Sequence, residues 1–484
     1  MRDPATLMPP PDYLEHAAAR RIVVGMLLTM LLAALDQVMV ATALPTIAAA
    51  LGDVDNMAWV VTANLLSATA ATPLYGKLSD IYGRRAMLLI AIGVYAAGSV
   101  ACALAPSMLM LIVGRSLQGF GGGGLMPLVQ TIIGDVASPR DRPRYQAYTS
   151  STFIVSMIGG PLMGGFVAEQ LHWSWLFWMN LPLCALAYAF THKILQRLPR
   201  HDRPHQLDLL GATLMVGAAI ALMLALTWGG RRYSWTSLPV ALLLLSSILL
   251  WALFAWRVMS ANEPFIPLTV LRDGAMRVGT TVAFFGVGGV IALTIVLPLY
   301  AQLALGLSAS RSAWSIIALQ GAATLSSIVG GRLLVRFTRY KWVPVVGLLV
   351  SSSALLPLAI APTAFSPSAA FALIALAGLG MGPLFPFTIV VVQNAVALHQ
   401  LGIATGTMNF FRALGSAFIV TGFGALVLAG APTLRGAAAG AVLGGTDPAV
   451  FGWVFGATIL CLVISLGCIL RLRERPLRGG RSPT

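Results

Sequence analysis

The chain has 484 residues, of which 58% are hydrophobic and only 10% are charged, and its mean hydropathy is +0.84. Ordinary soluble domains carry about 25% charged residues, so this composition excludes a typical soluble protein and indicates a membrane protein. The net charge of +15 would also suit a nucleic-acid-binding protein. The positions of the Lys and Arg residues must decide between the two classes.

Fourteen apolar runs are long enough to cross a hydrocarbon core of about 30 Å, which takes roughly 17 to 25 helical residues. They predict an all-α, polytopic membrane protein with fourteen transmembrane helices. In chain order, the predicted spans are residues 22–44, 57–75, 86–105, 107–133, 145–168, 173–192, 208–228, 237–256, 278–304, 312–334, 342–361, 367–396, 402–430 and 449–470.

The cations gather on one side of this predicted topology. If the N-terminus is cytoplasmic, 25 of the 31 Lys and Arg residues fall on the cytoplasmic side. This bias follows the positive-inside rule, so the basic charge reports topology and not binding of nucleic acid. An even number of helices also places the basic C-terminal tail in the cytoplasm. The cations that depart from the bias are Arg231, Arg232, Arg311 and Arg435 on the outer side, and Arg115 and Arg412 within spans.

The chain offers no sign of a cleaved leader, a metal centre or a catalytic cluster. Its first 21 residues are polar and Pro-rich, and no small-residue cleavage site follows the first apolar run, so no removable signal peptide is expected. All four Cys residues lie inside spans without metal-ligand spacing. All six His residues lie in loops or at helix ends. A membrane enzyme or sensor is therefore disfavoured.

Two parts of the chain are internal copies of each other. GFGGGGLMPLVQTII from Gly119 and GLGMGPLFPFTIVVV from Gly378 are 259 residues apart and share three alternate glycines and a proline. GKLSDIYGRR from Gly76 and GRLLVRFTRY from Gly331 pair near the same offset. Helices one to six thus correspond to helices nine to fourteen, in the same orientation. Parallel halves with a site at their interface are one plan of alternating-access carriers.

This repeat predicts a division of the chain into two bundles with an insertion between them. The expected parts are a cytoplasmic tail 1–21, a six-helix bundle 22–195, a linker with the inserted helices seven and eight 196–276, a second six-helix bundle 277–470, and a basic cytoplasmic tail 471–484.

Two charges inside the predicted spans are candidates for function, because a charge at the bilayer centre costs about 2.5 to 3.5 kcal/mol. Asp36 lies about 21 Å from the cytoplasmic end of helix one, and Arg115 lies at a similar height of about 18 Å in helix four. A carboxylate that faces a cavity can take up a proton on one side and release it on the other, and a mobile Arg would change its proton affinity. The alternative is a structural Asp36 with Arg115 as its fixed counter-ion.

Arg412 in helix thirteen has no acidic residue at its depth other than Asp36. It would face water, contact carbonyl groups or meet an anionic group of a substrate, and function and packing both remain open. Polar residues chosen by helix position predict the lining of a substrate cavity. They are Asn64, Gln118, Gln302, Gln393 and Asn409.

Two further segments combine glycines with residues that the membrane alone does not require. In helix five, Gly160 and Gly164 lie on one face and permit close helix approach, while Pro161 can kink the helix. Tight packing alone would explain this segment. Between helices two and three, the positive-inside bias explains Arg84 and Arg85 but not the neighbouring acid and glycine, Asp80 and Gly83.

At these residues the chain resembles the major facilitator superfamily over essentially its full length. The resemblance is closest to the fourteen-helix drug:proton antiporters of the EmrB/QacA type. The loop signature G-x-L-x-D-x-x-G-R-[RK] is met by Gly76, Leu78, Asp80, Gly83, Arg84 and Arg85, and the helix-four signature R-x-x-Q-G is met by Arg115, Gln118 and Gly119. The helix-one pattern of L-D followed by A-L-P is met by Leu35, Asp36, Ala43, Leu44 and Pro45. The antiporter motif G-P-x-x-G-G is met by Gly160, Pro161, Gly164 and Gly165.

The resemblance implies roles for these residues. Asp36 and Arg115 would serve proton coupling, and Arg412 matches an arginine common in helix thirteen of this type. The loop around Asp80 would control the inward-to-outward transition, and the antiporter motif would limit leakage and favours export. Three positions depart from the pattern. Ser156 replaces the usual Gly that opens the antiporter motif, and Ser174 replaces a usual Arg in helix six. Val335 in the second loop copy replaces the acid that the first copy has at Asp80, and this loss of an acid would weaken the C-terminal gate.

The function expected from the resemblance is proton-coupled export of small amphipathic compounds by alternating access, which is multidrug efflux of the kind that gives antibiotic resistance. It needs no cofactor beyond the proton gradient. The expected partners are the substrate, protons and the lipid bilayer of a bacterial inner membrane. A periplasmic adaptor and an outer-membrane channel are conceivable partners that the sequence does not indicate. The alternative is a proton-linked transporter of one metabolite, siderophore or amino acid. The spans contain no acid well inside the membrane other than Asp36. This mildly favours lipophilic substrates that are neutral, monocationic or anionic over dicationic ones.

Overall fold

The computed structural model describes residues 16–53, 56–138, 141–195, 207–230, 232–336, 339–429 and 447–474. Within these ranges the chain is helical, and an isolated bridge between Gly229 and Tyr233 is the sole β-type pairing. Residues 1–15 and 475–484 of the predicted tails, and 196–206 of the predicted linker, lie outside the described residues.

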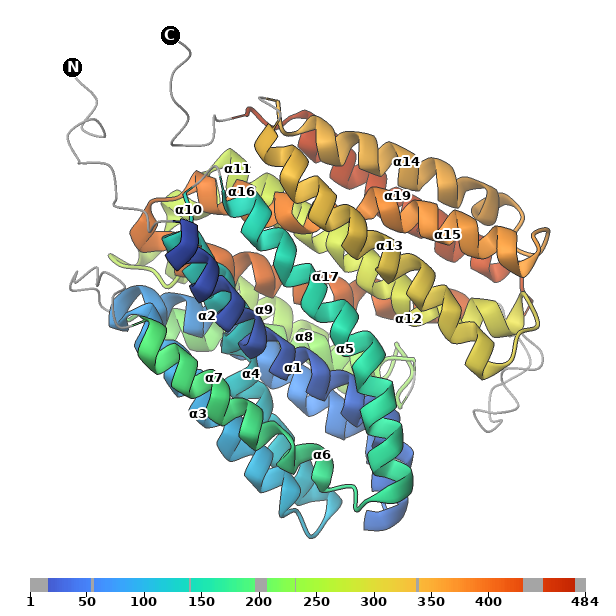
Figure 1. The fold of residues 1–484 in the computed structure, drawn as a ribbon, viewed down its shortest axis with the longest axis horizontal. Helices are drawn as coiled ribbons and strands as arrows, with labels where there is room; N and C mark the ends of the chain where they lie inside the picture. The colour runs from blue at the N-terminus through green and yellow to red at the C-terminus, as the bar shows by residue number, and fades with distance from the viewer. Residues whose placement is uncertain are drawn as a thin grey trace.

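The N-terminal part of the chain forms one group of packed helices (Figure 1). Long apolar segments form these helices because every backbone N–H and C=O is satisfied within a helix. The group consists of α1 (His16–Leu51), α2 (Met57–Tyr82), α3 (Arg84–Ala103), α4 (Met108–Val136), α5 (Arg142–Gln170), α6 (Trp175–Trp178) and α7 (Asn180–Ile194).

The second half repeats the arrangement after an intervening helix pair, α8 (Leu209–Trp228) and α9 (Leu238–Ser260). Helices α4 and α5 begin at Met108 and Arg142, and their counterparts begin 259 residues later at Pro367 and Leu401. The later helices are α10 (Leu268–Arg272), α11 (Gly274–Val282), η3 (Ala283–Val287), α12 (Gly288–Leu303), α13 (Ala309–Arg336), α14 (Trp342–Ile360), α15 (Pro367–Met381), α16 (Leu384–Ala395), η4 (Leu398–Gln400), α17 (Leu401–Ala429) and α19 (Val450–Leu470).

Ten helical stretches of the described residues are long and apolar enough to cross a membrane, so the chain is a multi-pass membrane protein. The other predicted spans are occupied by α2, α4, α5 and the α6–α7 pair, which pack among these ten. The ten stretches are Ile22–Leu51, Arg84–Ala103, Leu209–Trp228, Leu238–Ser260, Gly274–Leu303, Arg311–Arg336, Trp342–Ile360, Pro367–Ala395, Leu398–Val427 and Val450–Leu470.

The two halves meet at one end of the bundle, which we call the basic end because Arg84, Arg142, Arg257 and Arg336 lie at the helix termini there. The helix contacts between the halves join α2, α4 and α5 to α13, α16 and α17. In Figure 1 the halves lie together near the two chain ends and diverge toward the opposite end of the bundle. The structure is therefore closed between its halves at the basic end.

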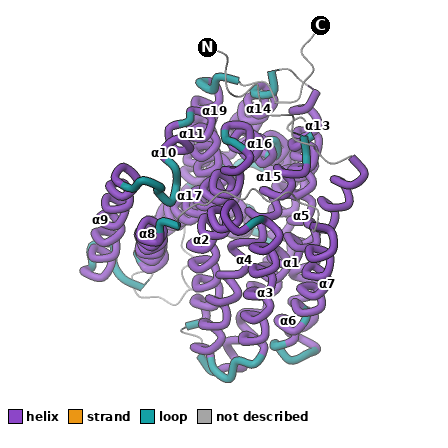
Figure 2. The backbone as a smooth tube through the Cα atoms, turned by 90° about the vertical axis from the view of Figure 1, so that its left-hand side faces the viewer, coloured by secondary structure: helices purple, strands orange, loops and turns teal. Residues whose placement is uncertain are grey.

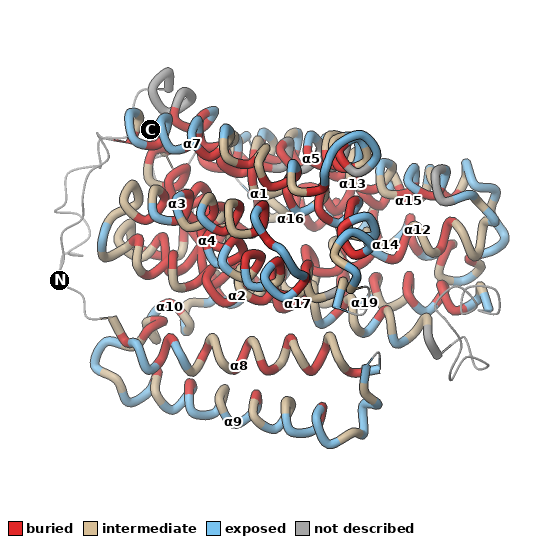
Figure 3. Tube along the Cα trace, turned by 90° about the horizontal axis from the view of Figure 1, so that it is seen from below, coloured by how far each residue is buried: buried red, intermediate tan, exposed pale blue. Residues whose placement is uncertain are grey.

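The inserted pair α8–α9 lies outside both halves and forms a separate layer beside α2 and α17 (Figures 2 and 3). Met215 and Met223 of α8 belong to the same apolar cluster as Leu66 of α2 and Phe410 of α17. The pair thus covers the line along which α2 meets α17. Its outer helix α9 exposes apolar side chains, such as Leu245 at 63%, as a lipid-facing helix does.

Glycines allow some helices to touch backbone to backbone. Gly347 of α14 and Gly380 of α15 face each other so closely that a Cβ on either would collide with the carbonyl oxygen of the other. At the turn between α2 and α3, Gly83 has φ of +90°, a conformation that side-chain-bearing residues rarely adopt.

The Gly380 contact makes a prediction about stability. Gly380→Ala should destabilise the fold by about 1 to 3 kcal/mol, because the added methyl group overpacks a backbone contact. The matched control is Gly467→Ala in α19, where an added Cβ meets nothing within 4 Å, so the gain in helix propensity should keep or raise stability. Thermal unfolding of the two purified variants measures the difference. An unfolding temperature of Gly380→Ala equal to that of Gly467→Ala would contradict this packing.

Candidate functional site

Asp36 is held by three side chains of its own half. The carboxylate is 2% exposed, at mid-helix in α1. Its Oδ2 accepts a hydrogen bond from Arg115 Nη1 of α4 at 2.7 Å. Its Oδ1 accepts one from Asn180 Nδ2 of α7 at 2.7 Å and one from Gln118 Nε2 of α4 at 3.2 Å. The structure thus brings Asp36 and Arg115 together as their shared depth predicted, and adds two neutral donors.

Arg115 is enclosed as completely as its partner, at 1% exposure. Its Nη1 also donates to Gln118 Oε1 at 2.5 Å, and its Nε donates to the Val60 carbonyl oxygen at 3.3 Å. The guanidinium carbon lies 5.9 Å from the centre of the Phe177 ring, within range of a cation–π interaction. Removing one member of such a buried pair costs about 3 to 5 kcal/mol because the other charge is left uncompensated.

The antiporter motif packs helix α5 against α1 just beyond Asp36. A Cβ at Gly160 would collide with Val38, and one at Gly164 would collide with Thr42 and the Met39 backbone. Both positions therefore need glycine for this close approach. Pro161 is exposed, and a Cβ at Gly165 would meet nothing within 4 Å, so these two motif positions do not make the α1 contact.

Asp80 joins the two halves at the basic end. Its carboxylate accepts hydrogen bonds from the backbone N–H groups of Gly402 at 3.0 Å and Ile403 at 2.7 Å, in the first turn of α17. A helix N-terminus offers free N–H donors and a favourable dipole to such an anion. Alongside, Gly76 of α2 meets Gly402 and Gly406 of α17 backbone to backbone. Glycine at these positions allows the carboxylate to reach the other half.

Arg84 completes this contact from within the first half. It pairs with Asp80, and its Nε donates to Asp135 Oδ2 at 2.9 Å. Asp80 lies beyond the predicted span 57–75. Burial raises the pKa of the Asp80 carboxyl, whereas Arg84 and the two backbone N–H groups lower it. The neighbouring Arg85 is different, because its Nε is buried and has no hydrogen-bond partner within the described part of the chain.

A second inter-half contact consists of amide side chains, Gln130 of α4, Gln146 of α5, Gln393 of α16 and Asn409 of α17, which we call the amide cluster. Gln393 Nε2 donates to the Gln130 carbonyl oxygen at 2.9 Å, and Asn409 Nδ2 donates to Gln130 Oε1 at 2.7 Å. Gln146 Nε2 donates to the same Gln130 carbonyl oxygen at 2.8 Å and lies 3.4 Å from Gln393 Oε1. All four side chains are buried. The cluster closes the space between the halves at the basic end with neutral hydrogen bonds.

The other residues expected to line a cavity lie apart from the cluster. Asn64 Nδ2 donates to the Arg115 carbonyl oxygen at 3.3 Å and so fixes α2 to α4. Gln302 Nε2 donates to Ser312 Oγ at 3.2 Å, within the second half. Arg412 does not reach Asp36: its Nη2 lies 2.7 Å from the Met126 sulfur of α4. The sequence offered Asp36 as the acid nearest to Arg412 in depth, but Asp36 is already engaged by three donors of its own half.

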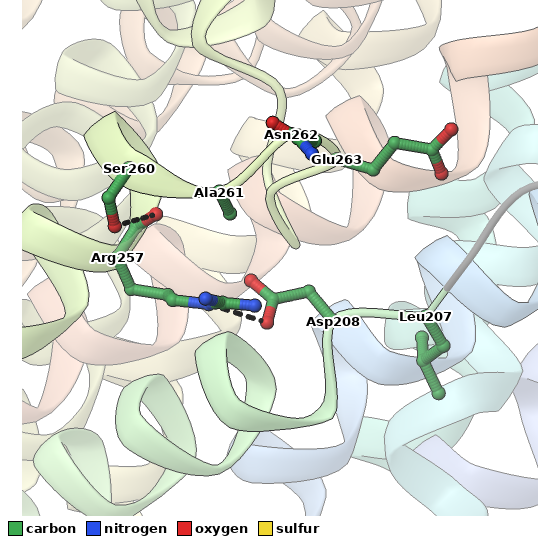
Figure 4. A pocket seen from close by; sticks show the side chains of 7 residues that line it. All are labelled: Leu207, Asp208, Arg257, Ser260, Ala261, Asn262 and Glu263. Atoms are coloured by element: carbon green, nitrogen blue, oxygen red, sulfur yellow. Dashed lines mark hydrogen bonds and ion pairs between the residues drawn. The ribbon is translucent and has the colours of Figure 1, made fainter.

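A pocket of about 440 Å³ lies at the basic ends of α8 and α9 (Figure 4). Asp208 Oδ1 accepts from Arg257 Nε at 3.0 Å and caps α8 through the Gly211 N–H at 3.0 Å. Its Oδ2 accepts from the Phe265 N–H at 3.2 Å. This polar pocket is bounded by the inserted pair and its following loop. Asp208 therefore serves to hold the inserted pair together.

Several residues of these sites were not predicted from the sequence. Asn180 is a polar residue within the apolar run WLFWMNLP, and Asp135 is an acid near the end of a predicted span. Both polar residues stand out in the sequence, but their positions do not indicate which side chain each one contacts. Within the described ranges, no group of three or more His, Cys, Asp or Glu residues could hold a metal ion.

Comparisons with known proteins agree with this architecture. A family model described as Major Facilitator Superfamily matches residues 26–420. Multidrug transporter protein MdtP of Bacillus subtilis (strain 168) is 30% identical over 406 residues, which are 84% of this chain and 75% of that protein. Multidrug resistance protein 3 of the same strain is 30% identical over 412 residues, 85% of this chain and 80% of that protein.

The fold is also similar to solved transporter structures. The crystal structure of the human organic anion transporter MFSD10 (TETRAN) superimposes with a TM-score of 0.66 and 16% sequence identity, covering 95% of this chain and 100% of that one. The family model covers most of the chain, and two relatives are 30% identical to it. The chain therefore belongs to the Major Facilitator Superfamily and is a transporter, not an enzyme.

Proposed function

We propose that the chain is a proton-coupled antiporter that exports small amphipathic compounds by alternating access. Two relatives at 30% identity bear multidrug names, which supports export of such compounds. The observation that carries the proposal is Asp36, a buried acid whose carboxylate is held by Arg115, Gln118 and Asn180. Buried ionisable groups in transport proteins commonly mark proton or substrate pathways.

We further propose that all fourteen predicted spans cross the membrane. Helix α2 runs from Met57 to Tyr82 and returns the chain to the basic end after α1, and α4, α5 and the α6–α7 pair alternate in the same way. The excess of Lys and Arg at the basic end supports its assignment to the cytoplasm. Both chain termini would then be cytoplasmic, in the plasma membrane of a bacterium, as in the EmrB/QacA type of antiporter.

In this proposal Asp36 exchanges its proton as the halves rock. A proton that enters from the diverging outer end neutralises Asp36 and ends its attraction for Arg115. Arg115 and Gln118 both lie on α4, which also provides Gln130 to the amide cluster. A shift of α4 would thus move Gln130 and disturb the amide cluster that closes the basic end. Separation of Asp80 from α17, together with opening of the amide cluster, would then expose the site to the cytoplasm.

Substitution of Asp36 tests proton coupling. Asp36→Asn should reduce substrate-dependent proton release from everted membrane vesicles to background, because the amide cannot exchange a proton at this site. Glu169→Gln, at an exposed acid near the end of α5, is the matched control and should keep proton release. Full proton release by Asp36→Asn would overturn its role in coupling.

A folding defect must be separated from a coupling defect, because Asp36→Asn leaves Arg115 without its counter-ion. The double variant Asp36→Asn with Arg115→Gln removes both charges and should recover most of the lost thermal stability. It should still fail to release protons. Recovery of both stability and proton release would show that the pair is structural.

Substitution of Asp80 tests the closure at the basic end. Asp80→Asn should raise the rate at which a membrane-impermeant thiol reagent labels Cys introduced at Ala147, which is buried beside Gly331 at the α5–α13 contact. The expected increase is about tenfold to a hundredfold, because hydrogen bonds to a charged group contribute about 1.5 to 3 kcal/mol. Asp53→Asn, an acid near the opposite end that bonds Asn56, should leave the rate unchanged. An unchanged rate in Asp80→Asn would contradict the gate.

A further inference from the structure

Arg412 differs from Arg115 and Arg84 because it forms no ion pair with an acid of the described residues. Arg115 is paired with Asp36, and Arg84 is paired with Asp80 and Asp135. Within the described part of the chain, Arg412 makes no ion pair, and the one side-chain acceptor within hydrogen-bond distance is the Met126 sulfur. A thioether is a weak acceptor for one of the five N–H donors of a guanidinium. No acid of the described residues therefore compensates this charge.

Arg412 lies on the interior face of α17. Thr405, Asn409 and Arg412 are spaced by four and three residues and so share one side of the helix. Asn409 of this stripe contacts Gln130 of α4, and Arg412 contacts Met126, one turn earlier on α4. Arg412 is thus the next layer above the amide cluster, on the side where the halves diverge.

Arg412 is less completely enclosed than its neighbours on α17. Its neighbours Met408 and Asn409 are buried, whereas Arg412 is intermediate in exposure. Asn409 Oδ1, the neutral acceptor one turn away on the same face, is buried and has no hydrogen-bond partner among the described residues, so Arg412 does not donate to the amide cluster. Apart from the contact with Met126 of the other half, the donors of Arg412 have no hydrogen-bond partner among the described residues.

The position is separate from the proton site. Met126 follows Arg115 by eleven residues on α4, which corresponds to about 16 Å along the helix axis. A group bound at Arg412 would therefore not replace the carboxylate of Asp36 at Arg115. The proton would bind at Asp36, within the first half, and the substrate would bind at Arg412, between the halves and at a different depth.

We infer that Arg412 recognises an acidic group of the transported molecule, so that the substrates include amphipathic compounds with a carboxylate or a similar anion. This inference rests on the proposed export function and names its substrate class. A guanidinium binds a carboxylate through two parallel N–H donors. Met126 beside it is a flexible, polarisable side chain that can pack against varied apolar bodies. An anion at this site would compensate the charge that the protein itself leaves unpaired.

The test compares lipophilic carboxylic acids with their own primary amides, for example a set of arylalkanoic acids and the matching arylalkanamides. Thermal stabilisation of the full-length chain, purified in an uncharged detergent, reports binding of each compound. The parent protein should bind the acids about tenfold to a hundredfold more tightly than the amides, the range expected for a hydrogen bond to a charged group. Arg412→Gln should abolish this preference, and Arg412→Lys should keep part of it.

Two controls separate recognition from folding. Arg311→Gln removes an exposed cation of α13 and should keep the preference for acids. Arg412→Gln should not lower the unfolding temperature without ligand, because it removes an uncompensated charge. A large loss of stability in Arg412→Gln, Arg412→Lys and Arg412→Met alike would show a structural role and overturn the inference.

The remaining outcomes also decide the inference. Equal binding of acids and amides by the parent protein, or a preference for acids that survives in Arg412→Gln, would overturn it. Stabilisation by phosphatidylglycerol but by none of the acids would assign Arg412 to a lipid headgroup and overturn the substrate class. Acid-selective binding without substrate-dependent proton release would leave this inference standing and overturn proton-coupled export. Proton-coupled export of cations alone would leave the proposed export function standing and overturn the acidic substrate class.

Discussion

The energetic cost of an uncompensated charge away from water is the constraint on which the interior of this transporter depends. Asp36 and Arg115 satisfy it within one half, and neutral amides complete their hydrogen bonding. Asp80 satisfies it across the halves, through backbone N–H groups of α17. The first arrangement concerns a single half, whereas the second depends on the closed basic end. The hydrogen bonds of Asp36 thus depend on the packing within one half, whereas those of Asp80 depend on the closed conformation of the whole molecule.

Close backbone packing makes the second arrangement possible. Gly76, Gly402 and Gly406 bring α2 and α17 near enough for Asp80 to reach the first turn of α17. The other seam, between α5 and α13, is closed by contact of Gly331 with Pro143 and Ala147 and has Val335 in place of an acid. The inserted pair α8–α9 also covers only the α2–α17 side. The two seams of a repeated fold therefore differ in charge and in covering.

Much of the fold could be predicted because hydropathy and helix length are local properties. Each predicted span coincides with one helix or with two or three consecutive helices, and the 259-residue repeat is also seen in the residues at which α4, α5, α15 and α17 begin. The Asp36–Arg115 pairing could be predicted from depth alone, since few other charges compete. The depth expected for Arg412 was wrong, because its contact Met126 lies about 16 Å along α4 from Arg115, the partner of Asp36. Gln393 and Asn409 were expected to line a cavity, but their hydrogen bonds with Gln130 and Gln146 were not predicted, because uncharged polar residues are common in these helices and do not indicate their partners.

By itself, the sequence determined that this protein is a helical membrane protein with repeated halves, and it narrowed the candidate charges to very few. These properties follow from composition, periodicity and the cost of placing charge in hydrocarbon. Only the tertiary structure decided which polar groups meet: that Asn180 holds Asp36, that Gln393 and Asn409 close the basic end, and that Arg412 contacts Met126. The reason is geometric, because partners depend on the rotation of each helix about its axis and on the packing of the two halves, which no single segment specifies.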